Sequence, residues 1–383
     1  MTREDLIGQA TQAQTPRGVV DLGIGQPQGA ILPVELMARA MTMAAATRLG
    51  HPLQYGTERG DGHLRAALGD FLTKHYGHPV DGGRLLVSNG NSQAIDLCCG
   101  ALTEPGDVVF VEEPTYFLAL RIFADHGLRV IGIPVDDDGI TIDALEAQLA
   151  VHSPRLLYCI PTAQNPTGAS MPLERRQRLV ELARQHEFLV LADEVYQLLD
   201  YSGTVPAPLA AQIDSGVVLS LGTFSKILAP GLRVGWIQAS DDLLDALVAR
   251  GQVVSGGGLN PFTAALLAPI LDDGGVDQYL DGLRATLQRR LAVMDDALRA
   301  HLGSEVRYRR PDSGYFFWLR FLDDVDTAAV LPAALEAGVG FQPGPASSTQ
   351  GGFANCLRLS FAHYDEADIR AAIARLGRVF ARS

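Results

Sequence analysis

A lysine lies between two apolar runs, where a charged amine is costly to bury. The apolar run 217–219 leads into small hydroxyl residues, Lys226 follows them, and a second apolar run comes after a Pro-Gly turn. An amine withdrawn from water loses part of its charge and becomes a nucleophile that forms Schiff bases with carbonyl groups. Thr223, Ser225 and Arg233 supply two hydroxyls and a cation that suit a phosphate close to that amine. In isolation, a lysine at an exposed corner between strands explains the same stretch equally well.

Three more polar side chains stand at similar places in the chain. Asn165, Asp193 and Tyr196 each follow an apolar run that predicts a buried strand, as Lys226 does. Between these runs the sequence has helical patterns, and such alternation predicts a mostly parallel sheet with helices on its faces. Ligands of sheets of this kind bind beyond the carboxyl ends of the strands. We therefore expect these four side chains to meet in one site.

A loop of small polar residues precedes the predicted helix 94–102. It reads Asn89-Gly90-Asn91-Ser92-Gln93. The first backbone N–H groups of a helix lack partners and attract anions, so the loop is a candidate anion site. Capping of the helix by the side chain of Asn91 or Ser92 is the simpler interpretation, and the local sequence favours it.

Pyridoxal 5'-phosphate (PLP) would give each of these groups a partner. Lys226 would form the imine, and Asp193 would keep the pyridine nitrogen protonated, because a carboxylate at the end of an apolar strand needs a partner. Asn165 and Tyr196 would donate hydrogen bonds to the ring phenolate. Tyr116 would stack on the ring, although a tyrosine there is also compatible with ordinary packing. The phosphate would lie among backbone N–H groups, hydroxyls and a cation, contributed by Asn91, Ser92, Thr223, Ser225 and Arg233.

The length of 383 residues indicates two domains. We expect an N-terminal arm over residues 1–30, a large PLP-binding α/β domain over 31–275 and a small α+β domain over 276–383. The arm would pack with the small domain, and a long helix at about 276–302 would join the two domains.

The composition limits the kinds of binding partner and the cellular compartment that we expect for this protein. A formal net charge of −13 argues against nonspecific binding of nucleic acid. No apolar run reaches the roughly 18 residues of a membrane span, and the polar start of the chain lacks an export signal, so we expect no membrane partner and a cytoplasmic protein. The four cysteines lie in apolar runs without C-x-x-C spacing, which favours buried free thiols and predicts no metal site.

The motifs, taken in order, resemble those of one enzyme family. Asn-Gly-Asn-Ser-Gln, Pro-Thr-Tyr, Asn-Pro-Thr-Gly, Asp-Glu-Val-Tyr and Thr-Phe-Ser-Lys followed by Pro-Gly-Leu-Arg-Val-Gly are similar to the motifs of fold type I, class I/II aminotransferases. The 2-aminoadipate/kynurenine, multi-substrate branch is the most similar, from about residue 20 to the end of the chain. The resemblance implies a large domain with a mostly parallel seven-stranded sheet and a small α+β domain. It also implies ping-pong transfer of an amino group from an L-amino acid to a 2-oxo acid through a Lys226 Schiff base, with Asp193 and Tyr196 as further catalytic residues.

The resemblance assigns further residues by position. Arg358 matches the arginine that binds the substrate α-carboxylate, with Asn165 beside it, and Gly25 matches the glycine of the arm that lies over the substrate. Tyr55 matches a tyrosine that reaches the phosphate of the neighbouring subunit's cofactor, which implies a homodimer. The chain departs from the family at Asn91 and Ser92, where Ser-Gln is more common, so the phosphate site is expected to differ in detail.

Two other classes of function fit the same residues. Enzymes that catalyse β- or γ-elimination, replacement, oxidation or hydroxylation of amino acids use the same cofactor-binding residues. A non-catalytic sensor domain that binds PLP or an amino acid is a third possibility, which the presence of Lys226 disfavours. The motifs do not identify which amino acid reacts.

Overall fold

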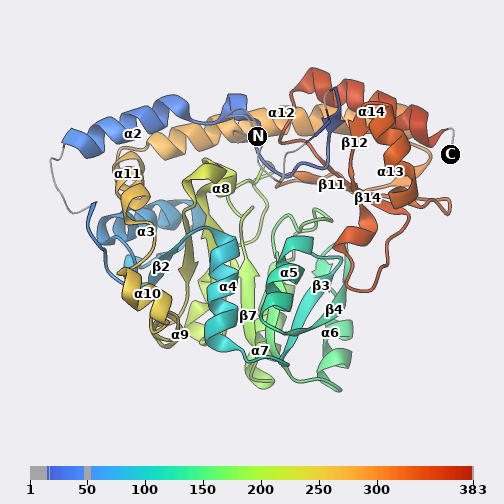
Figure 1. The fold of residues 1–383 in the computed structure, drawn as a ribbon. Helices are drawn as coiled ribbons and strands as arrows, with labels where there is room; N and C mark the ends of the chain where they lie inside the picture. Colours follow the sequence, from blue (N-terminus) through green and yellow to red (C-terminus); the bar gives the residue numbers. More distant parts are fainter. Residues whose placement is uncertain (1–14, 17, 47–52, 382–383) are drawn as a thin grey trace, which may run out of the picture.

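The computed structural model describes residues 15–16, 18–46 and 53–381, in which a large and a small part share one long helix (Figure 1). The large part is built on an eight-stranded sheet with the order β2-β9-β8-β7-β6-β3-β4-β5. The strands are β2 (Leu85–Ser88), β3 (Val108–Glu113), β4 (Arg129–Asp136), β5 (Gly139–Ile140), β6 (Pro154–Cys159), β7 (Leu189–Asp193), β8 (Val218–Thr223) and β9 (Gly235–Gln238). The five strands from β8 to β4 are parallel, while β9, β2 and β5 each run antiparallel to a neighbour.

The predicted mostly parallel sheet is confirmed, with one short addition. The strands from β2 to β4 in the sheet order are the seven expected, and β5 adds an eighth. β5 has two residues and pairs antiparallel with the end of β4. Two residues are too few to show an alternating pattern, so the sequence could not reveal this strand.

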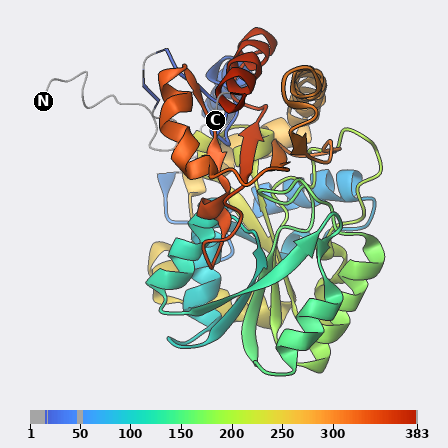
Figure 2. The ribbon, with the colours of Figure 1, turned by 90° about the vertical axis from the view of Figure 1, so that its right-hand side faces the viewer.

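Alternate residues of the central strands enter two separate cores, as the period of two in a strand requires. In β3, Val109 and Val111 face one core, while Phe110 faces the other. Both faces are covered, because α6 and α7 contribute to the second core and α4 and α5 to the first. Figure 2 shows the sheet between these two helical layers. Burial on both faces explains the continuous apolar runs of the sequence.

The helices of the large part are α2 (Val34–Ala46), α3 (Gly62–Tyr76), α4 (Asn91–Leu102), α5 (Phe117–Asp125), α6 (Ile142–Leu149), α7 (Leu173–Gln185), α8 (Phe224–Ile227), α9 (Asp241–Val248), α10 (Gly251–Gly256) and α11 (Pro261–Asp272). Short 3-10 turns are η2 (Gly29–Ile31), η4 (Gly82–Arg84), η5 (Leu209–Ser215), η6 (Pro230–Leu232) and η7 (Gly344–Ser347). None of the helices within the described ranges combines the length and hydropathy needed to cross a membrane.

The small part has its own antiparallel sheet, in the order β10-β11-β14-β13. Its elements are β10 (Val306–Arg307), β11 (Phe316–Phe321), α13 (Thr327–Glu336), β12 (Val339–Gly340), β13 (Gln342–Pro343), β14 (Cys356–Ser360) and α14 (Glu366–Phe380). The long helix α12 (Gly275–Leu302) runs along the top of Figure 1, from beside α11 to beside α14. Its predicted apolar residues at helical spacing are buried, namely Leu280, Leu283, Leu287, Leu291 and Met294. The arm joins this part through β1 (Val20–Asp21), which pairs with β12.

Candidate active site

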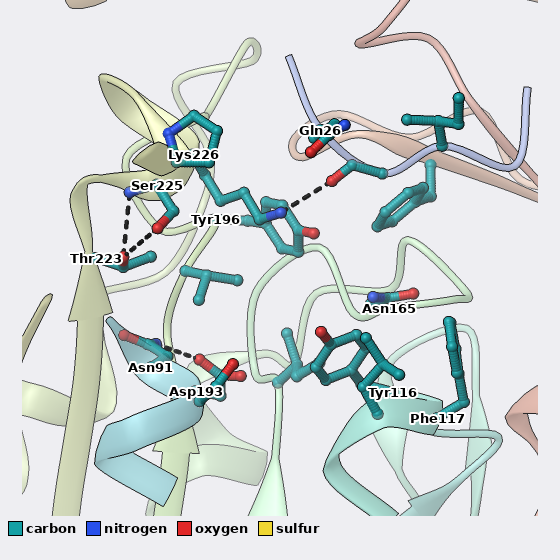
Figure 3. Close-up of a pocket in the computed structure, with 18 of the residues that line it drawn as sticks. Gln26, Asn91, Tyr116, Phe117, Asn165, Asp193, Tyr196, Thr223, Ser225 and Lys226 are labelled. Atoms are coloured by element: carbon teal, nitrogen blue, oxygen red, sulfur yellow. Dashed lines mark hydrogen bonds between the residues drawn. The ribbon is translucent and has the colours of Figure 1, made fainter. Parts of the chain in front are cut away.

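A cavity of about 490 Å³ lies beyond the carboxyl ends of β6, β7 and β8. Strand ends of the large part line it together with arm residues 21 and 23–26 and with four residues of the small part, Phe316, Phe341, Gln342 and Arg358. Cavities at such strand ends, between two parts of a chain, are the usual binding sites for small molecules. Figure 3 labels polar side chains that reach into it, among them the four predicted to meet: Asn165, Asp193, Tyr196 and Lys226.

Asp193 lies at the bottom of the cavity, where both of its oxygens accept a hydrogen bond. Asn91 Nδ2 donates to Oδ1 at 2.5 Å, and the Tyr158 hydroxyl donates to Oδ2 at 2.8 Å. Burial raises the pKa of this carboxyl to about 6, although the two hydrogen bonds and the Lys226 amine oppose the rise. The carboxylate is therefore held in a fixed orientation and retains lone pairs for one more donor.

Sequence reasoning missed Tyr158. This residue lies in the apolar strand β6, is fully buried and packs against Phe123. A buried tyrosine needs a partner for its hydroxyl, and the end of a neighbouring strand, where Asp193 lies, is one place to find it. That signal was present in the sequence, but it did not identify the partner.

Lys226 enters the cavity from α8, the single turn that follows β8. The Thr223 side chain caps this turn by accepting from the Ser225 N–H at 3.1 Å, and the Tyr315 hydroxyl donates to the Lys226 carbonyl at 2.7 Å. The amine donates to the Gly25 carbonyl of the arm at 2.8 Å. Burial lowers the pKa of Lys226 to about 8, with a smaller contribution from the positive charge of Arg358. A substantial neutral fraction near physiological pH makes this amine a nucleophile and a base.

The N-terminus of α4 and the α8 segment together form an anion cup. Gly90, with a φ of 79°, caps α4 without a side-chain hydrogen bond, so the interpretation that Asn91 or Ser92 caps this helix is wrong. Arg233 donates to the Asn89 carbonyl at 3.0 Å and to the Ser225 hydroxyl at 3.3 Å. The positive φ favours glycine at position 90, and a Cβ there would also lie 2.5 Å from the Arg233 guanidinium.

The other predicted phosphate residues lie around the same cup. Thr223 donates to the Ser225 hydroxyl at 3.0 Å, and the exposed Ser92 belongs to the cavity wall. Free helix N–H groups, hydroxyls and an arginine form a suitable site for a phosphate dianion.

Arg358 is a buried cation at the small-domain side of the cavity. It donates to Asn165 Oδ1 at 2.8 Å and to the Gly23 carbonyl at 2.7 Å, and its guanidinium carbon lies 4.2 Å from the Phe316 ring centroid. Burial lowers its pKa to about 10. Among the described residues, it has no salt bridge and its Nε has no hydrogen-bond partner. A buried guanidinium without a salt bridge is suited to bind an anionic group of a ligand.

The arm passes close to this cation. A Cβ at Gly25 would lie 2.9 Å from the Phe316 ring, so glycine lets the arm lie close over the site. Tyr116 caps α5 at the cavity wall, and Tyr196 is buried against Tyr315 and Phe316.

Tyr55 is the one predicted site residue that the fold keeps apart from this cavity. It is 82% exposed and does not belong to the cavity wall of its own chain. A role in the site therefore requires another subunit.

Comparison with known proteins identifies the family. Residues 17–376 match the family described as aminotransferase class I and II. The chain belongs to this family. Aromatic-amino-acid aminotransferase 1 from Thermococcus litoralis is 34% identical over 363 residues, which cover 94% of this chain and 87% of that protein. The solved multiple substrate aminotransferase from Thermococcus profundus has a TM-score of 0.90 at 30% identity and covers 100% of this chain and 97% of its own. The alpha-aminoadipate aminotransferase from Thermus thermophilus, solved with N-(5'-phosphopyridoxyl)-L-leucine, has a TM-score of 0.87 at 30% identity, covering 100% and 99%.

The protein is thus a PLP-dependent aminotransferase of fold type I, which confirms the predicted family, activity and cofactor. The cavity fits this cofactor on its own chemistry. It combines an anion cup, an amine with a lowered pKa and a hydrogen-bonded carboxylate that can accept from a protonated ring nitrogen. The family assignment favours transamination over elimination, oxidation or a sensor role.

Proposed function

We propose that this aminotransferase moves the amino group of an L-amino acid to a 2-oxo acid, with Lys226 as the reacting amine and Arg358 as the carboxylate clamp. One observation carries the proposal: a buried guanidinium without a salt bridge among the described residues shares a cavity with an amine of lowered pKa. When bound, PLP supplies an aldehyde that condenses with amines and a ring that withdraws electrons.

The proposed roles follow from the contacts. Arg358 and Asn165 fix the α-carboxylate, so that the α-C–H bond points toward the side of the cavity where the Lys226 amine lies. With the cofactor bound, Lys226 Nζ would be the base that accepts the α-proton and the acid that gives it up again. Asp193 would stabilise positive charge at the ring nitrogen, and the buried Tyr196 hydroxyl, together with Asn165, would donate to the ring oxygen.

The remaining cofactor residues act at the ends and faces of the ring. Tyr116 would cover one ring face, and Gly25 would let the arm lie close over the substrate. The anion cup would hold the phosphate through the backbone N–H of Asn91 and through Ser92, Thr223, Ser225 and Arg233.

Titration of the purified holoenzyme with single amino acids, without an acceptor, tests this function. The imine absorbance of the bound cofactor should disappear with a reactive amino acid and return on addition of a 2-oxo acid. A panel of amino acids in the same assay identifies the preferred substrate. Release of ammonia without any need for a 2-oxo acid would instead indicate an elimination or oxidation enzyme.

The pKa of Lys226 makes the capture of PLP by the cofactor-free enzyme depend on pH. Only the neutral amine attacks the aldehyde, so the capture rate should rise about tenfold per pH unit below pH 8 and level off above it. Stopped-flow absorbance in an amine-free buffer measures this rate. Arg358→Met removes a cation that lowers the pKa and should move the inflection to higher pH. A wild-type rate that keeps rising to pH 10 contradicts the lowered pKa.

We also propose that the active unit is a homodimer in which Tyr55 completes the partner's phosphate site. Supporting this, large apolar side chains are exposed on α2, on the 53–60 loop and on α10 and α11, which pack against one another: Val34, Met41, Leu53, Tyr55, Val254 and Phe262. A Cβ at Gly257 would lie 3.1 Å from Tyr55 Cβ, so the loop and the end of α10 are in direct contact. Exposed apolar residues grouped in this way are typical of a subunit interface.

Hybrid dimers test the position of Tyr55. Tyr55→Ala should weaken PLP binding about 10- to 100-fold, the usual effect of one hydrogen bond to a charged group. A hybrid of one Tyr55→Ala chain and one Lys226→Ala chain should contain one site with wild-type PLP affinity, because that site combines intact Lys226 with the partner's intact Tyr55. If Tyr55 served its own chain, the only site with a lysine would keep the weakened affinity.

We also propose the domain boundaries and the cytoplasmic compartment that the sequence predicts. The division at residue 275 is supported by sheet membership, since β2 to β9 lie before it and β10 to β14 after it. The pairing of β1 with β12 supports an arm that packs with the small domain. A reducing, cytoplasmic compartment is supported by the four cysteines, which are all buried free thiols.

A further inference from the structure

Asn91 lies beside the residues predicted to bind the phosphate, but its side chain points away from them. It is the first residue of α4 and is nearly fully buried. Its amide nitrogen donates to Asp193 Oδ1 at 2.5 Å, and Figure 3 shows the two side chains meeting below the lysine. The amide must present its NH₂ end to the carboxylate, because the opposite orientation would bring two acceptors together.

The other end of the amide cannot serve the phosphate. Asn91 Oδ1 is buried and has no hydrogen-bond partner among the described residues. An amide oxygen is an acceptor, and a phosphate dianion offers only acceptors, so contact between the two is repulsive. What position 91 offers the phosphate is its backbone N–H at the start of α4.

We propose that the Asn91 side chain is a positioning residue for Asp193: it fixes the carboxylate that pairs with the pyridine nitrogen and favours the ionised form of that carboxylate. The proposal rests on the function proposed above, in which this carboxylate lies at the ring nitrogen. Tyr158 performs the same task on the other oxygen, so the two donors hold the carboxylate from both sides.

The groups around Asp193 make these two donors important. Of the charged side chains that act on Asp193, Lys226 from α8 favours the ionised carboxylate, while the adjacent Glu194 disfavours it. Burial raises the pKa of the neighbouring Glu112 of β3 to about 8, so this carboxyl is largely neutral near physiological pH. A carboxylate that loses a hydrogen-bond donor becomes more basic. It then draws the shared proton from the ring nitrogen to its own oxygen, and the neutral ring withdraws electrons less strongly.

Nuclear magnetic resonance of the holoenzyme, loaded with PLP labelled with ¹⁵N at the pyridine nitrogen, tests this proposal without relying on activity. In the wild type the resonance should be that of a protonated nitrogen. Asn91→Ala and Asn91→Ser should both move it toward the unprotonated position, and Tyr158→Phe should move it in the same direction. Arg233→Gln removes the cation of the phosphate cup but leaves both hydrogen bonds of Asp193 intact, so it should leave the resonance in place.

Affinities for PLP and for pyridoxal, which lacks the phosphate, separate the two possible roles of Asn91. Asn91→Ala should weaken both ligands by a similar factor, about tenfold for one hydrogen bond to a charged group. Arg233→Gln should weaken PLP alone. Loss of PLP affinity in Asn91→Ala with unchanged pyridoxal affinity and an unchanged ¹⁵N resonance would identify Asn91 as a phosphate ligand and overturn the proposal. An unprotonated nitrogen in the wild type would instead overturn the proposed placement of the ring at Asp193.

Discussion

Lys226→Ala is expected to lower turnover by at least about 10⁴-fold, because the substitution removes both the amine that condenses with the cofactor and the base that moves the α-proton. The anion cup does not depend on the amine, since its contacts come from α4, Thr223, Ser225 and Arg233. The variant should therefore still bind PLP, without the imine absorbance of the wild type. Single-turnover kinetics with the reactive amino acid measure the loss, and equilibrium dialysis measures the retained PLP.

A small primary amine added to Lys226→Ala provides the control. The side chain leaves a space beside Gly25, and an exogenous amine that enters it can carry the proton in place of Nζ. Partial recovery that increases with amine basicity would show that the variant lacks only a base. Turnover by Lys226→Ala close to the wild-type rate, in the absence of added amine, would exclude Lys226 as the reacting residue.

The sheet and the cofactor residues could be predicted because each has a local signal. Buried parallel strands appear as apolar runs, and a polar residue directly after such a run lies at the edge where ligands bind. Asn165, Asp193 and Lys226 follow this rule, and the structure brings them to one cavity. The two-residue strands β5 and β13 carry no comparable signal, because their pairing depends on the neighbouring strand and not on their own pattern.

The contacts that adjust the site could not be predicted, because they depend on side-chain direction across strands. The sequence places Asn91 at a helix start and therefore near a phosphate, but only the fold shows that its amide turns to Asp193. Tyr158 and Asp193 are 35 positions apart on adjacent strands, and their hydrogen bond depends on the register between β6 and β7. The contacts of the arm could not be predicted either. The Gly23 carbonyl accepts from Arg358 and the Gly25 carbonyl accepts from Lys226, and no local sequence pattern predicts these hydrogen bonds.

Asp193→Ala is expected to reduce kcat by about 10³-fold while the protein stays folded. Removing one partner of a buried ion pair costs about 4 kcal/mol, and this loss falls on the charged ring in the reacting complex. Asn91 and Tyr158 would lose their acceptor, but each keeps a buried position that a water molecule can reach through the space left by the carboxylate. Steady-state kinetics with the preferred amino acid give the factor, and circular dichroism checks the fold.

PLP methylated on its pyridine nitrogen distinguishes the charge of the ring from other consequences of Asp193→Ala. The methylated ring carries a permanent positive charge and needs no carboxylate to hold a proton, and the alanine leaves room for the methyl group. It should restore a large part of the turnover in Asp193→Ala, while in the wild type the methyl group meets the Asp193 carboxylate and should reduce activity. Equal impairment of Asp193→Ala with both forms of the cofactor would contradict an electrostatic role and would make Asp193 a residue that only supports the cavity floor. Recovery would show that Asp193 acts by keeping positive charge on the ring nitrogen.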